Sequence, residues 1–278
     1  MPSFEILCTT MHQTDFSKIG EMNIHSDIVL ANQADTTNYT QLEFEGHTAK
    51  MITTATRGVG INRNLSLTYA SADICLFADD DVVYHNDLEK TVVSEFNKHP
   101  DADIIVFHLE TDSIERQQKK YTKTKKHLRF ARMPWGTFRI AFRLNAVKKA
   151  NIWFTPLFGG GCVFPCGEDS FWLNDAKKAG LTFYVSKETI GKVSFDTSSW
   201  FSGYNEKYFY ARGAFYSAVH SKTDSLWMRY FAWRTRKMCY MPYRDKIKWM
   251  KNGRDGYNQM LSYENYIAKC CQNEETQK

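Results

Sequence analysis

The chain has 278 residues and a formal net charge of +5 at pH 7, an excess too small to predict a nucleic-acid-binding protein. Hydrophobic residues make up 43% of it, so we expect a buried core in one large α/β domain, or in one domain with a small appendage. The sequence shows neither a run of eighteen uncharged apolar residues nor a secretory leader pattern, so no membrane-spanning helix and no export are expected.

Short apolar runs and helical spacing alternate along the first part of the chain. They predict strands at residues 4–8, 27–31, 49–54, 73–78 and 103–108, and helices at residues 62–72 and 88–96. Because the strands are apolar on both faces, we expect a mostly parallel sheet that helices cover on both sides.

The middle of the chain begins with a lysine-rich segment at residues 115–129, which predicts an exposed loop or mobile flap. A strand is expected at 137–142, a helix at 168–180 that ends at Gly180, and a strand at 181–185. From Asn205 onward the pattern is helical and rich in aromatic and basic residues.

The cysteines predict reduced thiols rather than a disulfide framework, because their number is odd and two of them lie in predicted strands. Cys162 and Cys166 have no second pair of ligands at zinc spacing. Together with the N-terminal pattern, this cysteine usage predicts a cytoplasmic protein.

Three consecutive aspartates, Asp79, Asp80 and Asp81, follow the most apolar predicted strand. Ligands of parallel sheets bind at the carboxyl ends of strands, and three adjacent carboxylates repel one another unless a cation neutralises them. Asp79 and Asp81 point the same way in an extended chain, and hard divalent cations prefer oxygen ligands. The alternative is a solvated acidic turn before the next helix, and the triplet alone leaves both open.

Two further segments carry glycines beside charged residues. Thr56–Asn64 places two glycines and two arginines at the entry to a helix, which suits a phosphate, although an ordinary strand-to-helix turn would look the same. The glycines of Phe158–Gly167 permit a substrate to approach the backbone. Glu168 and Asp169 follow them at the start of a helix, where acidic residues are also ordinary.

The order and spacing of these blocks resemble family 2 of the glycosyltransferases. The resemblance spans roughly residues 4–220 and rests on Arg57–Leu65, on Asp73–Val82 and on the Glu-Asp pair. It implies the GT-A fold, a Rossmann-like αβα sandwich with a mostly parallel central sheet. We expect this domain at 1–222, with a nucleotide-sugar half near 1–110 and an acceptor half near 130–222, followed by a basic, aromatic helical extension at 223–278.

The resemblance implies an inverting glycosyltransferase that moves a sugar from a nucleotide sugar, by default a UDP-sugar, to a hydroxyl of a glycan or lipid-linked acceptor in surface polysaccharide synthesis. Asp79 and Asp81 would hold Mn²⁺ or Mg²⁺ at the leaving diphosphate. Asp169, with Glu168 beside it, would take the proton of the acceptor hydroxyl. The implied binding residues are Thr9, Asn32, Arg57, Arg63, Asp79 and Asp80 for the donor, and Gly160, Gly161 and Trp200 for the acceptor.

One departure from the family concerns a histidine that many relatives carry near Val193–Phe195, where it can help ligate the metal or the phosphates. No histidine stands there in this chain. His220 is a weak candidate for that role, because a lone histidine on an aromatic helix is more often structural.

The C-terminal segment from Leu226 to Arg254 interleaves Trp, Phe and Met with Arg and Lys. Such a helix can lie in the interface of an anionic membrane, here the inner face of the cell membrane. It can equally pack its aromatic side chains on its own domain and leave the cations in water.

Two alternatives to a glycosyltransferase follow from the same residues. A sugar nucleotidyltransferase would carry a glycine-rich loop with Lys or Arg directly after the first strand, whereas Thr9–Gln13 follows here. A non-catalytic carbohydrate-binding or membrane-binding protein on a decayed scaffold would not need Asp79, Asp81 and Asp169 intact.

Overall fold

The computed structural model describes residues 1–112, 120–127, 136–193 and 203–275. The chain divides into two compact units, the first made of Met1–Thr155 with Asp169–Thr197 and the second of Pro156–Glu168 with Ser198–Lys278. This division differs from the predicted one at residue 222, because α6 (Glu206–Val219) packs on the C-terminal helix α8 (Tyr243–Asn258).

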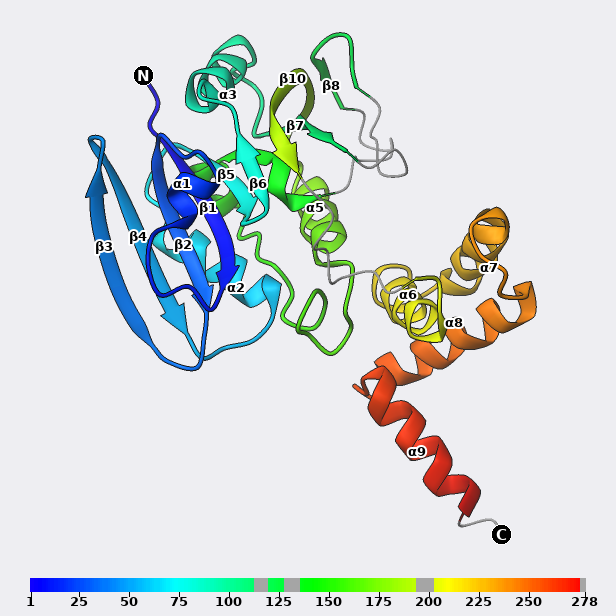
Figure 1. Cartoon of the computed structure of the whole chain (residues 1–278). Coiled ribbons are helices and arrows are strands. Elements are labelled where there is room, and N and C mark those ends of the chain that lie inside the picture. The colour runs from blue at the N-terminus through cyan, green and yellow to red at the C-terminus, as the bar shows by residue number, and fades with distance from the viewer. Residues whose placement is uncertain (113–119, 128–135, 194–202, 276–278) are drawn as a thin grey trace. The chain divides into compact units, whose positions relative to one another are not determined.

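A mixed sheet forms the middle of the first unit (Figure 1). In spatial order its strands are β3 (Asn38–Phe44), β4 (His47–Thr54), β2 (Asp27–Gln33), β1 (Phe4–Met11), β5 (Ile74–Asp79), β9 (Ile140–Arg143), β7 (Ile104–Thr111), β10 (Phe183–Val193) and β6 (Val82–Tyr84), with β8 (Lys125–Lys126) beside β10. Strands β4, β2, β1 and β5 are parallel, and so are β7 and β10. The expected parallel core is therefore confirmed, while β3, β9, β6 and β8 are antiparallel to their neighbours.

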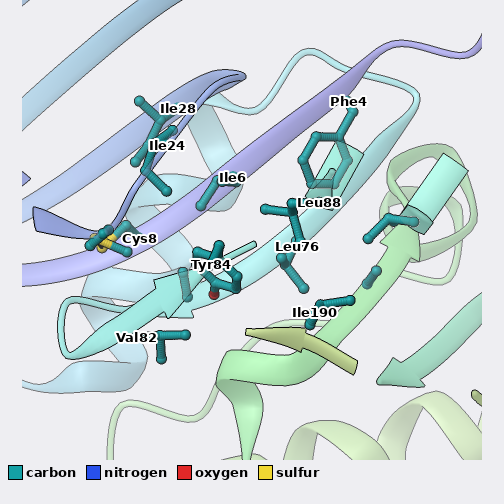
Figure 2. Packing of buried hydrophobic residues seen from close by; sticks show 14 of the residues in the cluster. Phe4, Ile6, Cys8, Ile24, Ile28, Leu76, Val82, Tyr84, Leu88 and Ile190 are labelled. Carbon is teal, nitrogen blue, oxygen red and sulfur yellow. Dashed lines mark hydrogen bonds between the residues drawn. The ribbon is translucent and has the colours of Figure 1, made fainter. Parts of the chain in front are cut away.

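Helices cover both faces of this sheet, as expected for an αβα sandwich. On one face, α1 (Lys18–Glu21) and α3 (Leu88–Lys98) pack in a cluster of buried side chains with β1, β5 and β6. Figure 2 shows labelled side chains of these strands meeting Leu88 of α3. On the other face, α2 (Val59–Tyr69), α4 (Leu144–Lys149) and α5 (Glu168–Lys178) form a second cluster around Trp172 and Phe77, whose ring centroids lie 5.5 Å apart.

Strands β3 and β6 were not predicted, and the sequence of β3 explains why it was missed. β3 is a polar edge strand that buries no residue, so it lacks the apolar alternation that identifies a half-buried strand. Glu45 and Gly46 both have positive φ in the turn to β4, as in the tight turns of two-residue hairpins. Helix α2 ends at Tyr69 rather than at the predicted Ala72, because Ala70 is extended.

The second unit contains α6, α7 (Asp224–Arg234), α8 and α9 (Tyr263–Glu275). Helices α6 and α8 cross with their backbones almost in contact. A β-carbon at Gly213 would lie 1.9 Å from the carbonyl oxygen of Met250, and one at Gly253 would lie 1.9 Å from that of Tyr210. Glycine is therefore required at the crossing. In the described ranges, none of the helices combines the length and apolar character that a bilayer crossing requires.

We predict that Gly253→Ala destabilises the protein by at least about 2 kcal/mol, because the new methyl group must push two backbones apart. Thermal unfolding checks the prediction. Gly20→Ala is the control, since a β-carbon there meets no atom within 4 Å and alanine is the better helix former. A Gly253→Ala variant that melts with the wild type would contradict the close crossing.

Candidate active site

The three aspartates stand at the carboxyl end of β5, where β1 lies beside it with Thr9 opposite Asp79. The Thr9 hydroxyl donates to Asp79 Oδ1 at 3.3 Å, and the Thr10 hydroxyl donates to Asp80 Oδ2 at 2.5 Å. Two of the three carboxylates are therefore held by the neighbouring strand.

Arg63 on α2 holds Asp79 from the other side. Its side chain is buried, and its Nη2 donates to Asp79 Oδ1 at 2.9 Å while the guanidinium lies over the ring of Phe154 at 5.5 Å. The preceding residue, Asn62, donates to the carbonyl oxygen of Ala31 at 2.6 Å. These contacts fix the start of α2 against the end of the sheet, and a donor contact of Arg63 stays a prediction.

The glycines of the segment Thr56–Asn64 allow the start of α2 to lie close to the neighbouring backbone. A β-carbon at Gly60 would lie 2.7 Å from the carbonyl oxygen of Thr155. Gly58, the residue before α2, has a φ of 117°, which only glycine adopts easily. Part of the glycine pattern thus has a structural cause that is independent of any phosphate.

Asp81 differs from its two neighbours. The pKa of its carboxyl is raised to about 6, first by loss of surrounding water and then by the negative charges of Asp79 and Asp80. The residue is nevertheless exposed by its accessible area, so we give more weight to the repulsion between carboxylates than to burial. A cation beside Asp81 would relieve that repulsion.

The aspartates fit a hard divalent cation by donor chemistry, because carboxylate oxygens are the ligands that Mg²⁺ and Mn²⁺ prefer. Among the described residues, no three His, Cys, Asp or Glu side chains gather into a metal-holding group. A metal contact of Asp79 and Asp81 therefore stays a prediction.

Two other residues assigned to the donor have local partners. Asn32 is fully buried, and its amide bonds the backbone of Gln13 at 2.9 and 3.0 Å and the hydroxyl of Thr53 at 3.0 Å. Arg57 is exposed and pairs with Asp35. These contacts order the loops at the ends of β1 and β2, and a donor contact of either residue stays a prediction.

Asp169 lies in the first turn of α5. Its Oδ1 accepts hydrogen bonds from the backbone N–H of Ser170 at 2.6 Å and from the Ser170 hydroxyl at 3.2 Å, and its Oδ2 accepts one from the N–H of Gly136 at 3.4 Å. Gly136 directly precedes the 3₁₀ turn Thr137–Arg139, which packs against β5. Asp169 is thereby tied to the segment that lines the end of β5.

The sequence did not single out Gly136. Its φ of 108° allows the chain to turn before β9, and a glycine directly before a predicted strand was the available signal.

The second glycine-containing segment belongs to the second unit. Gly159 and Gly161 have φ values of 110° and 75° in a turn closed by a hydrogen bond from the Gly159 N–H to the carbonyl oxygen of Phe164. A β-carbon at Gly167 would lie 2.6 Å from the Phe215 ring. The turns of this segment require these glycines for structural reasons, so an acceptor contact of Gly160 or Gly161 remains a prediction.

Some predicted features lie outside the described residues: Trp200, the positions at Ser194 and Phe195, and residues 115–119 and 128–129 of the lysine-rich segment. His220 stacks on Trp227 at 4.7 Å within the second unit. Cys8 and Cys75 are buried, whereas Cys270 and Cys271 are exposed.

The first unit is thus an α/β sheet whose carboxyl edge carries three aspartates, one of them held by a buried arginine. Residues 25–156 match the family model described as Glycosyl transferase family 2. Residues 25–156 therefore belong to glycosyl transferase family 2, the family of enzymes that the sequence predicted.

Comparison of structures finds similar folds in crystal structures of S. aureus TarS. Residues 1–349 of TarS in complex with UDP-GlcNAc match with a TM-score of 0.57 and 14% identity, over 94% of this chain and 93% of that one; the complex with UDP gives the same values. A longer TarS structure matches with a TM-score of 0.56 over 92% of this chain and 55% of that one. The likeness confirms the expected GT-A-type fold. The comparison with curated protein sequences gave no match.

We predict that Asp81→Asn stabilises the metal-free protein at pH 7.5 and not at pH 4.5. A raised pKa means that the folded state binds the proton more tightly than the unfolded state, so stability falls as the pH rises from about 3.8 to about 6, and the loss is complete above that range. Removing the charge should therefore raise Tm by about 2–4 °C above pH 6, for a gain near 1 kcal/mol.

Calorimetric melting at the two pH values, with EDTA present, measures this difference. The matched control is Asp87→Asn, an exposed carboxyl beyond β6. An equal effect of Asp81→Asn at both pH values would show that repulsion within the triplet does not govern the stability of this edge.

Proposed function

We propose that the protein is an inverting glycosyltransferase that moves a sugar from a UDP-sugar to a hydroxyl group of a glycan or lipid-linked acceptor. The observation that carries this proposal is the gathering of two carboxylate centres at one end of the first unit's sheet. Asp79, Asp80 and Asp81 end β5, and Asp169 bonds Gly136, just before the turn that packs on β5.

The choice of a UDP-sugar is supported by the structural neighbours. TarS, whose fold this chain shares, has been crystallised with UDP-GlcNAc and with UDP. In this chain, the pair of buried Arg63 and half-buried Asp79 stands beside Asp81, so a cation and a diphosphate could both be balanced there. Asp79 and Asp81 would hold Mn²⁺ or Mg²⁺, which supplies positive charge for the departing diphosphate when bound.

Asp169 is the general base in this proposal. In an inverting transfer, the acceptor oxygen forms a bond to the anomeric carbon as the bond from that carbon to the UDP oxygen breaks, and UDP leaves with the bonding electrons. The acceptor hydroxyl must lose its proton in this step, and the carboxylate of Asp169 accepts it. The hydrogen bonds from Ser170 and Gly136 fix the direction of that carboxylate, while Glu168 orients a substrate hydroxyl.

We predict that Asp169→Asn lowers sugar transfer by about 10²–10⁴-fold, the usual cost of losing a general base. UDP release from a panel of UDP-sugars, with Mn²⁺ or Mg²⁺, identifies the donor in the wild type and then measures the variant. Binding of UDP should survive, because the amide keeps the shape of the carboxylate. Asp175→Asn, on the same helix and paired with Lys178, is the control and should keep full activity. Transfer by Asp169→Asn at the wild-type rate would return Asp169 to the role of a helix-end acid.

We further propose that α7 brings the enzyme to an anionic membrane. One side of α7 is buried through Met228 and Ala232, whereas Leu226, Tyr230 and Trp233 are 63%, 47% and 54% exposed. Exposed cations flank these apolar and aromatic side chains: Arg229, Arg234, Arg236 and Lys237. Apolar side chains with a border of positive charge suit the headgroup region of an anionic bilayer.

The packing of the second unit decides which experiment can test this membrane contact. Deleting everything from Leu226 onward would remove α8 and uncover the face of α6 that Met250 and Gly253 cover. Point substitutions on the outer side of α7 and in the 3₁₀ turn Thr235–Lys237 that follows it avoid this damage, because they leave the α6–α8 crossing intact.

We predict that Arg229→Gln, Arg236→Gln and Lys237→Gln together weaken binding to anionic vesicles by about 10–100-fold, since each cation near such a surface contributes about 1 kcal/mol. Co-sedimentation with phosphatidylglycerol vesicles at low and high salt measures the loss. The control removes the same charge from the first unit, at Lys90, Lys123 and Lys149, which are all exposed. Wild-type protein that stays in the supernatant at low salt would contradict the membrane contact.

A further inference from the structure

Arg139 is a buried cation for which the described residues provide no acidic partner. The residue is 3% exposed, and within the described ranges its Nε has no hydrogen-bond partner. Burial lowers the pKa of the guanidinium to about 10, so it still carries its charge at neutral pH. A buried charge without a partner destabilises the folded state, and a fold rarely retains one without a use.

Arg143, four residues further along the same segment, shows how a structural arginine is treated in this chain. Its Nε donates to the carbonyl oxygen of Ala102 at 3.0 Å, its Nη2 donates to that of Phe96 at 3.2 Å, and the guanidinium lies 5.1 Å from the centre of the Phe96 ring. The described part of the protein therefore provides hydrogen-bond acceptors for the Arg143 guanidinium and none for the Nε of Arg139.

The location of Arg139 points to the substrate end of the sheet. β9 runs antiparallel to β5 and β7, with Ala141 opposite Leu76 and Ile105, so residues before Ile140 lie toward the carboxyl ends of both strands. Arg139 closes the 3₁₀ turn there, three residues after Gly136, the donor to Asp169.

Tyr121 lies near enough to Arg139 to raise the pKa of the guanidinium, against the larger effect of burial, and both Arg139 and Lys120 act on His108. His108 on β7 is half-buried, and its pKa is lowered by burial and then by the charges of Arg139 and Lys120, against a smaller opposite effect of Glu110. We call Arg139, His108 and Lys120 the Arg139 cluster.

We propose that the Arg139 cluster binds an anionic group of the acceptor, a phosphate or a carboxylate. The proposal rests on the proposed function, since it names the class of acceptor for that reaction. An oxyanion would supply hydrogen bonds to the guanidinium, and arginine matches phosphate and carboxylate geometry with paired donors. Binding would then offset the cost of burying the charge, so the acceptor would be chosen by its charge near the reacting hydroxyl.

Thermal unfolding of Arg139→Met and Arg143→Met tests the first part of this proposal. Arg139→Met should raise Tm by about 3–8 °C, because an apolar side chain of similar length replaces an unpaired buried charge. Arg143→Met should lower Tm, because it leaves two carbonyl oxygens without their donor. A Tm of Arg139→Met below that of the wild type would overturn the assignment.

The second part uses simple probes with UDP and Mn²⁺ present to fill the donor site. Glucose 6-phosphate and glucuronate test the two anions, and glucose is the neutral control. At least one anion should raise the Tm of the wild type and of Arg143→Met with the logarithm of its concentration, and it should leave Arg139→Met unchanged. The anion that acts identifies phosphate or carboxylate as the recognised group.

Equal shifts with glucose, or an anion response that Arg139→Met retains, would overturn the proposal. Failure of the proposed function would look different: UDP with Mn²⁺ would not shift the Tm of the wild type, and no UDP-sugar would be turned over, whatever the anions do.

Discussion

The hydrogen bonds that fix Asp79 join three elements of the first unit. Thr9 of β1 and Arg63 of α2 both donate to the same carboxylate oxygen at the end of β5. This arrangement holds the start of a helix against the carboxyl edge of the sheet and neutralises one of three neighbouring negative charges. Asp81 has a raised pKa, first because it has lost surrounding water and then because of the negative charges of Asp79 and Asp80. The chemistry proposed for this edge depends on that uneven distribution of charge.

The same edge collects residues that are distant in the sequence. Asp169 reaches it through the N–H of Gly136, and Arg139 reaches it because β9 inserts antiparallel between β5 and β7. A purely parallel sheet would put the start of every strand at the opposite edge. Because β9 is antiparallel, the turn that precedes it, Thr137–Arg139, lies at the edge of the sheet that carries the aspartates.

The sequence predicted the strands that are apolar on both faces and the aspartates that end one of them, because burial and charge leave direct traces in residue type. It did not predict β3, whose polar residues lie at the edge of the sheet, or the grouping of α6 with α8, which depends on glycines that close a helix crossing. Arg139 was also missed. Whether an arginine is buried, and whether anything pairs with it, depends on contacts between strands that a linear pattern does not contain.

The crossing of α6 and α8 divides the second unit into positions that tolerate change and positions that do not. At Gly213, Gly253 and Gly256, the β-carbon of any other residue would lie less than 2 Å from a neighbouring atom. Substitution of these glycines is therefore not tolerated. The outward side of α7 faces no such restriction. A lineage of such enzymes could exchange the aromatic and basic residues of that surface, and so change where in the cell it works, while the helix crossing and the sugar-transfer machinery are inherited unaltered.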